Sequence, residues 1–400
     1  MSGVKILHIA QDEKFINGAH YLFEQAFPGK NTFVIIKPPA DPPIRFLSNA
    51  LVASARFELR SKSSVARLVE SSSHYAITVL HGMNQFNMNV FLESPYKNNF
   101  IGIVYGAEIY NSGLLQNVLM GEKSKQLYQD TTQRYTVYDR LKDIYRIFKY
   151  RNHEPLNEVD LTQVLYQLNV FGSLPGMNYE EYIDQELYNP FVQRLPFTYY
   201  PIEHIIKDDS LKVSGDNILL GNSASATNNH LEALDLLSEY QLGDRKIVAP
   251  LSYGCSRYAK EIESEGRKQF GDHFIPLTSF LPIDEYNQCM SSCGIVVMNH
   301  YRPQAVGNII AALYMGSKVF LNETSIYQYF TNLGCHIYSI KKDLIGTKKA
   351  LMLLSDKEVA HNRTILKNNL GTSALVDGMR EGIDNIFDLK ATNSKREAIL

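Results

Sequence analysis

The stretch that decides the fold lies at residues 218–223 and reads Ile218-Leu219-Leu220-Gly221-Asn222-Ser223. Three apolar residues end at a glycine, small polar residues follow, and a helical pattern begins at Asn228 or Asn229. This order predicts a buried strand, a tight turn and a capped helix start. The first turn of a helix offers free backbone N–H groups and the positive end of a dipole, so it suits a phosphate. An ordinary turn between a strand and a helix has the same pattern, so both interpretations stay open here.

Apolar runs and helical patterns alternate along the whole chain. The runs predict strands near 4–10, 32–37, 74–80, 99–105, 167–171 and 196–200, and then near 217–221, 245–250, 273–277, 294–299, 317–321 and 336–340. Helical spacing lies between most of them, for example at Leu231, Leu234 and Leu237. Such alternation predicts an α/β protein whose parallel sheets are covered by helices on both faces, as in doubly wound folds.

The length of 400 residues predicts two domains of about 200 residues each. The segment 201–216 is polar and charged without periodicity, so we place the linker there. We expect an N-terminal Rossmann-like domain at 1–205, a C-terminal Rossmann-like domain at 206–385 and a tail at 386–400. In open α/β sheets ligands bind at the carboxyl ends of the strands, and two such domains leave a cleft facing those ends.

Composition limits the classes of partner and compartment. The formal net charge is −2, so bulk charge gives no sign of nucleic-acid binding. The N-terminus runs directly into a strand without a signal-peptide pattern, and no run of 18 apolar residues occurs. We therefore expect a protein of the reducing cytoplasm. Cys289 and Cys293 have no zinc-like partners nearby and are interpreted as small apolar residues on one helix face.

Polar residues follow four predicted strands of the second half, at the edge where a ligand is expected. They are Gly221, Asn222, Ser223, Tyr253, Gly254, Arg302, Gly307, Asn308, Asn322 and Glu323. Gly307 and Asn308 lie on the first turn of a predicted helix behind the cationic Arg302, and a diphosphate needs such donors. Asn322 and Glu323 carry oxygens that accept hydrogen bonds from sugar hydroxyls. Each of these residues, taken alone, has a simpler explanation, such as helix–sheet packing at Gly307. Polar residues at the ends of four strands together favour a sugar-nucleotide site.

These patches resemble the bacterial transferases of 4-acetamido-4,6-dideoxygalactose (Fuc4NAc), which are 4-alpha-L-fucosyltransferase-like and form glycosyltransferase family 56. The resembling runs are 218–230, 248–254, 302–307 and 319–322, together with His81-Gly82, Gln85-Phe86-Asn87 and Tyr105-Gly106-Ala107-Glu108-Ile109-Tyr110. The last run looks like the family's Gly-Ala-Asp-Leu-Tyr element, except that Glu108 replaces its aspartate. The similarity covers most of the chain but is weak outside these patches.

The resemblance implies the two-domain GT-B fold, with the donor in the C-terminal domain and the acceptor in the N-terminal domain. It implies transfer of an amino-deoxy sugar from a dTDP- or UDP-sugar to a lipid-linked saccharide, in synthesis of enterobacterial common antigen or a similar surface polysaccharide such as O-antigen. Work at a lipid carrier implies a cytoplasmic enzyme peripheral to the inner membrane. No organic cofactor is expected.

Two chemical tasks need residues: stabilising the leaving diphosphate and deprotonating the acceptor hydroxyl. No Asp-x-Asp motif stands at a predicted strand end, so we expect no metal and assign the diphosphate to helix dipoles, backbone amides and Arg302. Glu108 and His81 are the candidate catalytic bases, because both follow strands of the first domain. A histidine after a strand is often a structural hydrogen-bonding residue. His20 is a further candidate for acceptor contact, with a helix-start role as the alternative.

Two basic, aromatic-rich stretches suit an anionic membrane surface. The first spans 45–67 and includes Arg45, Phe46, Arg56, Phe57, Arg60, Lys62 and Arg67. The second includes Arg134, Tyr135, Tyr138, Arg140, Lys142, Tyr145, Arg146, Phe148, Lys149, Tyr150 and Arg151. The alternative for both is a solvated helix face with its apolar side in the core.

Two other functions fit the same architecture. A sugar-nucleotide 2-epimerase would need several carboxylates and histidines around one sugar, and the sequence offers only Glu323 and His300 on the donor side. A two-domain sugar-binding protein without catalysis would leave a base such as Glu108 without a task.

Overall fold

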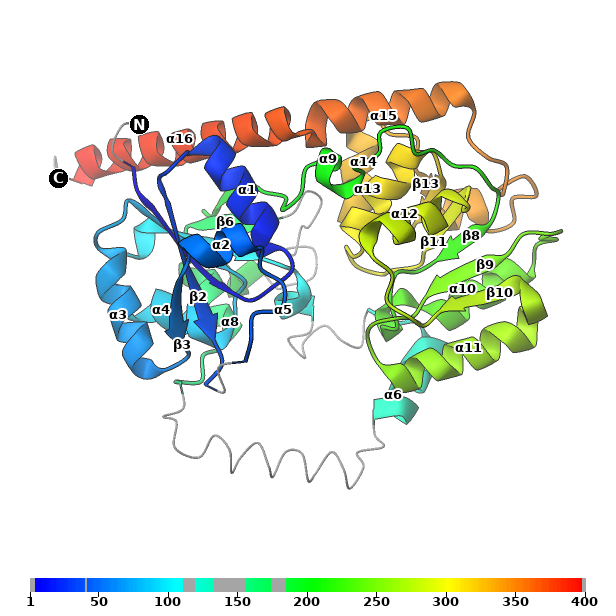
Figure 1. Cartoon of the computed structure of the whole chain (residues 1–400), viewed down its shortest axis with the longest axis horizontal. Helices are drawn as coiled ribbons and strands as arrows, with labels where there is room; N and C mark the ends of the chain where they lie inside the picture. The colour runs from blue at the N-terminus through cyan, green and yellow to red at the C-terminus, as the bar shows by residue number, and fades with distance from the viewer. Residues whose placement is uncertain (1–3, 40–41, 111–118, 133–155, 174–184, 398–400) are drawn as a thin grey trace. The chain divides into compact units, whose positions relative to one another are not determined.

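The structure is a computed structural model, and it describes residues 4–39, 42–110, 119–132, 156–173 and 185–397. Contacts divide the chain into two compact units. Figure 1 shows the chain coloured by residue number from the N-terminus to the C-terminus. Unit 1 consists of Met1–Ser112, Tyr138–Pro201 and Thr372–Leu400, and unit 2 consists of Gly113–Val137 and Ile202–Gly371. This division differs from the predicted one, because a segment before residue 138 belongs to unit 2 and the segment from Thr372 belongs to unit 1.

Within the described residues, seven parallel strands form the sheet of unit 1 in the order β3-β2-β1-β4-β5-β6-β7. They are β1 (Ile6–Gln11), β2 (Asn31–Lys37), β3 (Arg56–Leu59), β4 (Ile77–His81), β5 (Phe100–Val104), β6 (Val170–Ser173) and β7 (Gln193–Pro196). The prediction of a strand at 196–200 is wrong, since β7 ends at Pro196 and Phe197 and Tyr199 pack into the core beyond it. The edge strand β3 is absent from the sequence-based prediction, because its mostly exposed residues lie in a stretch interpreted as helical.

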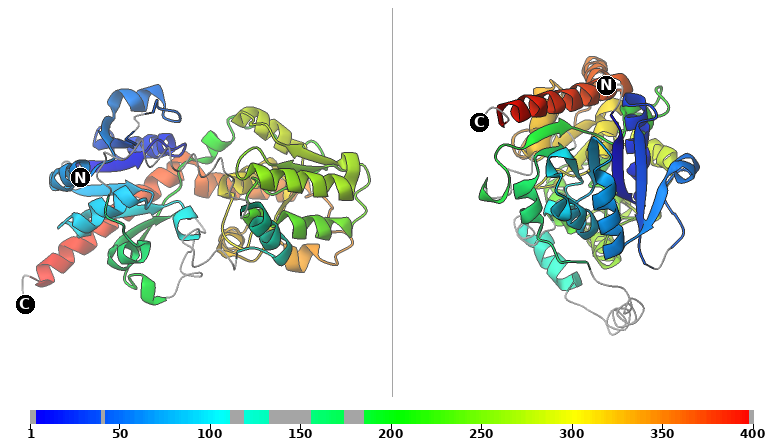
Figure 2. Two further views of the ribbon diagram at one scale, coloured as in Figure 1. Left: turned by 90° about the horizontal axis from the view of Figure 1, so that it is seen from below. Right: turned by 90° about the vertical axis from the view of Figure 1, so that its left-hand side faces the viewer.

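The described helices of unit 1 cover both faces of this sheet. They are α1 (Ile16–Ala26), α2 (Asn49–Ser54), α3 (Lys62–Ser72), α4 (Gln85–Glu93), α5 (Ala107–Tyr110), α8 (Leu161–Gln167) and α16 (Thr372–Glu397). Helices α1 and α16 share one core with the sheet, in which Phe23, Met379 and Ile383 are buried. Figure 2 shows the red helix α16 lying along unit 1, where the sequence analysis expects the end of a C-terminal domain and a tail.

Unit 2 has a sheet of six parallel strands among the described residues, in the order β10-β9-β8-β11-β12-β13. They are β8 (Ile218–Leu220), β9 (Ile247–Pro250), β10 (Phe274–Leu277), β11 (Ile295–Met298), β12 (Lys318–Leu321) and β13 (Tyr338–Ser339). The strand order reverses between β8 and β11, and such a switch point is where doubly wound sheets bind ligands. The decisive stretch at 218–223 therefore forms the central strand and its following turn, as predicted.

The described helices of unit 2 are α6 (Glu122–Thr132), α9 (Ile202–Ile205), α10 (His230–Ser238), α11 (Ser256–Phe270), α12 (Ile283–Ser291), α13 (Val306–Met315), α14 (Ser325–Asn332) and α15 (Asp356–Leu370). In Figure 1, α12 and α13 lie on one side of the sheet and α10 and α11 on the other. Ile218 and Leu220 of the central strand pack with α10 and α11, as do Leu127 and Tyr128 of α6. Alternate residues of β8 thus face opposite helix layers.

The predicted linker is fastened to unit 2 rather than independent of it. Val213 N donates to Met315 O (2.9 Å), and Ser214 N donates to Ser291 O (2.8 Å). Asp209 accepts hydrogen bonds from Tyr314 and, at 2.9 Å, from Lys367. These bonds to Tyr314 and Lys367 hold the pKa of the Asp209 carboxyl at about 2. The chain passes between the units at residue 202, ahead of this fastened segment.

Candidate functional site

A chain of hydrogen bonds joins the loops that follow β8, β9 and β11 in unit 2. Thr227 Oγ1 donates to Gln304 Oε1 (2.8 Å), and Gln304 Nε2 donates to Asn222 Oδ1 (2.9 Å). Asn222 Nδ2 in turn donates to the Tyr253 hydroxyl (2.8 Å). The structure therefore brings together Asn222 and Tyr253, which the sequence predicts for the same site. Thr227 and Gln304 are absent from the predicted set, although both lie in the polar loops that the sequence analysis singles out.

The side chain of Asn228 holds the loops after β8 and β11 in place. Its Oδ1 accepts hydrogen bonds from Asn222 N (2.9 Å) and from His300 Nε2 (2.8 Å), and its Nδ2 donates to Ser223 O (3.1 Å). His300 is buried, and burial lowers its pKa well below the usual value, so its ring is neutral with the proton on Nε2. His300 consequently works as a structural donor beneath the loop, and Ser223 is held by the same network.

Gly221 and Gly254 are glycines because the protein itself fills the space beside them. A Cβ on Gly221 would lie 2.7 Å from Asn228 Oδ1 and 2.8 Å from His230 Nε2, and φ is +68°. At Gly254, with φ of +113°, a Cβ would lie 2.5 Å from Ala224 O. Side chains of α10 and of its preceding turn therefore occupy the space beside the Cα of Gly221.

This packing predicts the effect of Gly221→Val. A non-glycine residue in the left-handed region costs about 1–2 kcal/mol from backbone sterics alone. The clash with Asn228 and His230 adds to that cost. We expect a clearly lowered midpoint in chemical denaturation, with Gly307→Val as the matched control near the wild-type midpoint. An unchanged midpoint for Gly221→Val would contradict the packing described here.

Gly307 shows the opposite situation on the first turn of α13. It is exposed, and no heavy atom lies within 4 Å of where its Cβ would be, so the helix–sheet packing explanation for this glycine is wrong. Ala305, with φ of +59°, turns the chain into the helix. The backbone at this helix start is thus open on one side, next to half-buried Arg302, whose Nη1 donates to Pro303 O (3.2 Å). Asn308 Nδ2 donates to the Tyr286 hydroxyl (2.9 Å) on α12.

The two predicted residues after β12 already have protein partners. Asn322 Nδ2 donates to Asn299 Oδ1 (2.9 Å) and to His300 O (3.1 Å). Glu323 forms an ion pair with Lys342 (2.7 Å), and the hydrogen bond from Lys342 lowers the pKa of this exposed carboxyl. Asn322 therefore joins the network that fixes the β11 loop, while Glu323 points to a lysine beyond β13.

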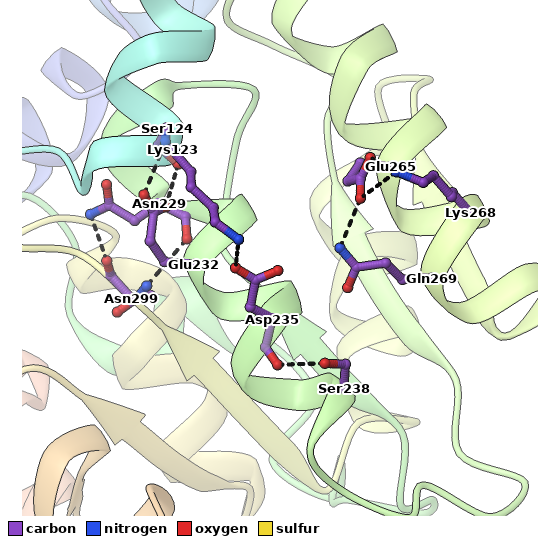
Figure 3. A network of polar contacts seen from close by, with 10 residues as sticks. All are labelled: Lys123, Ser124, Asn229, Glu232, Asp235, Ser238, Glu265, Lys268, Gln269 and Asn299. Carbon is purple, nitrogen blue, oxygen red and sulfur yellow. Dashed lines mark hydrogen bonds and ion pairs between the residues drawn. The ribbon is translucent and has the colours of Figure 1, made fainter.

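Helix α6 is fastened to the start of α10 by a network that Figure 3 shows at close range. Asn229 Oδ1 accepts from Gly121 N (2.8 Å), while Asn229 Nδ2 donates to Asn299 O (2.9 Å) after β11. One turn on, both oxygens of Glu232 accept from Ser124, at 2.9 Å from its N and 2.5 Å from its Oγ. A segment that lies between β5 and β6 in sequence thus supports the loops of unit 2, a contact between distant segments that the sequence analysis does not predict.

Glu108 lies at the carboxyl edge of the sheet in unit 1, on the short helix α5. Its Oε1 accepts from Met83 N (3.1 Å) and from Tyr105 N (3.4 Å). Its Oε2 is buried and, within the described part of the chain, has no hydrogen-bond partner. Burial raises the pKa of this carboxyl, against the lowering effect of the backbone donors. One oxygen is therefore held in place, and no described residue donates a hydrogen bond to the other.

His81 is the last residue of β4 and is only 1% exposed. Its Nε2 lies 3.0 Å from His8 Nδ1 on β1, and burial lowers the pKa of His81 to about 3. Gly82, which follows it, is covered by the ring of Tyr105. His20 lies in the middle of α1 and not at its start, so the helix-start alternative is wrong; it is half-buried with its edge against Phe33. Of these histidines, His81 is the one beside the Glu108 region.

Glu13 is a neighbour of Glu108 that the sequence analysis does not include. It follows β1 with an exposed side chain, and partial desolvation raises the pKa of its carboxyl. Its charge also contributes to the raised pKa of Glu108. The signal that points to Glu13 is its position, since a carboxylate two residues beyond a strand at the switch point of a parallel sheet lies at the ligand edge.

The first basic, aromatic-rich stretch forms α2, β3 and α3, and part of it is exposed. Phe46, Phe57 and Leu59 are exposed large apolar side chains, and Arg56 and Arg60 are exposed cations. Arg67 forms an ion pair with Glu58 (2.6 Å). The solvated-helix alternative does not describe this stretch, because its centre is an edge strand. The second stretch, from Arg134 to Arg151, lies outside the described residues.

The residues that the structure describes contain no group of three or more histidine, cysteine, aspartate or glutamate side chains placed to hold a metal ion. No helix described in the structure combines the length and apolar character needed to cross a membrane.

Comparisons with known proteins bear on the fold and on the class of enzyme. Residues 146–333 match the model of a family described as 4-alpha-L-fucosyltransferase, glycosyl transferase group 56. The structure of Anabaena HepE with UDP-glucose has a TM-score of 0.54 at 10% identity, covering 96% of this chain and 100% of that chain. A glycosyltransferase from Rickettsia africae has a TM-score of 0.56 at 12% identity, covering 97% and 99%. An O-GlcNAc transferase mutant from Thermobaculum terrenum has a TM-score of 0.56 at 10% identity, covering 98% of this chain and 69% of that chain.

At these identities the structural likeness establishes the fold, which is GT-B with two doubly wound α/β domains. The predicted fold class is thereby confirmed. The family match covers the segment that contains the carboxyl ends of β8, β9, β11 and β12. Taken together, the match and the fold make the chain a glycosyltransferase, as the sequence predicts.

Proposed function

We propose that this glycosyltransferase moves an amino-deoxy sugar of the Fuc4NAc type from a dTDP-sugar, or a UDP-sugar, to a lipid-linked saccharide. The reaction would serve surface polysaccharide synthesis, such as enterobacterial common antigen or O-antigen, at the cytoplasmic side of the inner membrane. The observation that carries the proposal is the match of residues 146–333 with the fucosyltransferase family, because that segment includes the polar edge of the sheet in unit 2.

Donor binding is assigned to unit 2. The first turn of α13 offers backbone N–H groups and the positive end of a ten-residue helix, and Gly307 leaves that turn open. Arg302 adds a cation beside it, suited to the diphosphate whose negative charge grows as the bond to the sugar breaks. Asn222 and Tyr253 supply polar groups at the switch point between β8 and β11. The UDP-glucose complex of HepE supports a nucleotide-sugar as the donor class.

Acceptor activation is assigned to unit 1, with Glu108 as the general base. The acceptor hydroxyl gives its proton to the free oxygen of Glu108, and its own oxygen forms the new bond to the anomeric carbon. The bond between that carbon and the diphosphate oxygen breaks, and the nucleoside diphosphate leaves with the electron pair. A carboxyl with a raised pKa suits this step, because its carboxylate is a stronger base and takes the proton more readily.

Mixing experiments test the proposal against its alternatives. The protein is incubated with dTDP-Fuc4NAc, with and without a membrane extract that contains lipid-linked saccharides. We expect transfer of the sugar into the lipid fraction only when the extract is present. Conversion of the sugar-nucleotide without extract would indicate an epimerase, and binding without any conversion would indicate a sugar-binding protein. Either of these results would contradict the proposal.

Turnover is expected to be independent of a divalent metal. The sequence has no Asp-x-Asp motif at a strand end of either sheet, and the work of a metal is assigned to Arg302 and the α13 amides. Excess EDTA should therefore leave the initial rate of sugar transfer within about twofold of its value without chelator. A collapse of the rate that magnesium or manganese restores would overturn this assignment.

The exposed part of the first basic stretch is proposed as the membrane-contacting surface, made of Phe46, Arg56, Phe57, Leu59 and Arg60. Charge reversal of Arg56 and Arg60 together should weaken binding to vesicles with anionic lipids by about 1 kcal/mol for each charge near the surface. Vesicle sedimentation measures this effect. Turnover of a short water-soluble acceptor should stay unchanged.

Arg67 provides the matched control for that surface. It lies on α3 and is paired with Glu58, so its reversal should weaken vesicle binding less than reversal of Arg56 or Arg60. If the unmodified protein does not sediment with anionic vesicles at all, the stretch is a solvated surface and the membrane-contact proposal fails.

A further inference from the structure

A line of hydrogen-bonded side chains crosses unit 1 from its surface to His81. Glu24 and Asn31 stand at one end, His8 lies between, and His81 forms the other end. Asn31 Oδ1 is 3.1 Å from His8 Nε2, and His8 Nδ1 is 3.0 Å from His81 Nε2. The proposed reaction uses none of the first three residues, so their arrangement calls for a separate explanation.

The amide of Asn31 has only one sensible orientation. Its Nδ2 faces three acceptor oxygens: Phe23 O at 3.1 Å, Phe27 O at 2.8 Å and Glu24 Oε1 at 2.8 Å. Turning the amide over would set its carbonyl oxygen against these three oxygens and lose those three bonds, in exchange for at most one from its NH2 group to His8. The Asn31 oxygen must therefore face His8, and an oxygen of an amide can only accept a hydrogen bond.

The position of every proton along the line follows from that orientation. Both rings are fully buried, and burial lowers the pKa of His8 and of His81, so each carries one proton. His8 must place its proton on Nε2 to donate to Asn31, which leaves its Nδ1 as an acceptor. His81 must then place its proton on Nε2 to donate to His8. The remaining nitrogen, His81 Nδ1, carries a lone pair and no proton.

Packing fixes the rings in the planes that these bonds require. The ring of His8 stacks on Phe33 with centroids 4.1 Å apart and an interplanar angle of 3°, and Phe23 meets it edge-on at 4.5 Å. His81 Nδ1 is buried and has no hydrogen-bond partner among the residues that the structure describes. A buried polar atom without a partner is rare in folded proteins, and one explanation is a water or ligand group that binds there.

We infer that Glu24, Asn31 and His8 are positioning residues that hold His81 in its Nε2–H form, so that Nδ1 accepts a hydrogen bond from an O–H group in the acceptor site of unit 1. This inference rests on the proposed function, which assigns the acceptor to unit 1. The O–H group is either that of the acceptor saccharide or that of a bound water. In both cases His81 acts as an acceptor that helps orient the hydroxyl for the base.

The test reads the tautomer directly. In a chain labelled with ¹⁵N-histidine, protonated and unprotonated ring nitrogens of a neutral imidazole resonate far apart. We expect an unprotonated Nδ1 and a protonated Nε2 for both His8 and His81. The spectrum is repeated with lipid-linked saccharide in detergent: a shifted Nδ1 signal assigns the acceptor hydroxyl, and an unshifted signal assigns water. A proton on His81 Nδ1 in the unmodified protein overturns the inference.

A pair of variants links the tautomer to turnover. His8→Gln keeps a donor for Asn31 and an acceptor for His81, so it should keep the Nε2–H form and most of kcat. His8→Phe keeps the stacking on Phe33 but offers no acceptor, so His81 should populate the Nδ1–H form. We expect kcat to fall by about 10- to 100-fold, the range found when a metal-binding histidine loses the partner that orients it, with the KM for donor unchanged.

The outcomes separate the inference from the proposed function. Full kcat in His8→Phe, with an altered tautomer, would overturn the positioning role. If His8→Phe does not fold, the spectra of the unmodified protein and of His8→Gln decide. Absence of sugar transfer by the unmodified protein would defeat the proposed function, while the tautomer would still be measured without any turnover.

Discussion

Replacement of Glu108 by glutamine is expected to lower kcat by about 10²–10⁴-fold, the contribution that a general base makes, with donor affinity nearly unchanged. Glutamine keeps the shape of the side chain and the hydrogen bond from Met83, but it cannot take a proton. Steady-state transfer of labelled sugar gives kcat, and calorimetric titration gives donor affinity. Near-normal turnover of Glu108→Gln would remove Glu108 as the base and leave His81 as the better candidate.

The pH dependence of kcat/KM tests independently whether Glu108 is the general base. Burial raises the pKa of Glu108, so the protonated, inactive form persists to a higher pH than for an ordinary carboxyl. The ratio kcat/KM should therefore rise with pH as Glu108 loses its proton, and this acidic limb should vanish in Glu108→Gln. A limb that survives the substitution belongs to another group, such as Glu13.

Three further variants show how the turnover of Glu108→Gln is to be interpreted. Glu108→Asp restores the residue of the resembling family and should retain partial activity, because the carboxylate remains but its reach is one methylene shorter. His81→Asn should cause a smaller loss than Glu108→Gln, because His81 is fully buried and hydrogen-bonded to His8. Glu70→Gln, an exposed position on α3, is the matched control and should behave as the unmodified protein.

Replacement of Arg302 by alanine is expected to weaken donor binding by about 1.5–3 kcal/mol, the value of a hydrogen bond to a charged group. That corresponds to roughly a 10- to 150-fold higher dissociation constant. The loss should be seen with dTDP and UDP alike, because Arg302 is assigned to the diphosphate and not to the base. Calorimetric titration with both nucleotides measures it.

Arg245→Ala provides a control from the other end of the sheet. Arg245 precedes β9, at the amino edge of unit 2, and is paired with Asp216 (3.3 Å). Its removal should leave the affinity for both nucleotides unchanged. Equal affinities for Arg302→Ala and the unmodified protein would move the diphosphate away from the start of α13.

The regular parts of the fold can be predicted from the sequence because local hydrophobic patterns indicate them. The apolar runs near 218–220, 247–250 and 295–298 are central strands buried on both faces, so each stands out from its polar flanks. The edge strand β3 has no such contrast, since Arg56 and Glu58 alternate with side chains that are themselves exposed. Edge strands of this kind do not show in a search for buried runs.

The features of the fold and of the site that could not be predicted depend on contacts between residues far apart in the sequence. Gly221 and Gly307 look alike in sequence, as small residues between a strand and a helix. Only the structure shows that Asn228 fills the space beside Gly221 while the space beside Gly307 is open. The docking of α6 on α10 depends on Ser124 and Glu232, which are too far apart in sequence for any periodicity to relate them.

The most direct test of the central claim is amide hydrogen exchange with and without dTDP, with dTMP as the control that lacks the second phosphate. We expect dTDP to slow exchange at the first turn of α13, residues 306–309, and in the loop after β8, residues 221–225. We expect a smaller effect of dTMP at α13. Protection by dTDP that leaves both segments unchanged, or that falls on other parts of the chain, would contradict the assignment of the donor to this edge of unit 2.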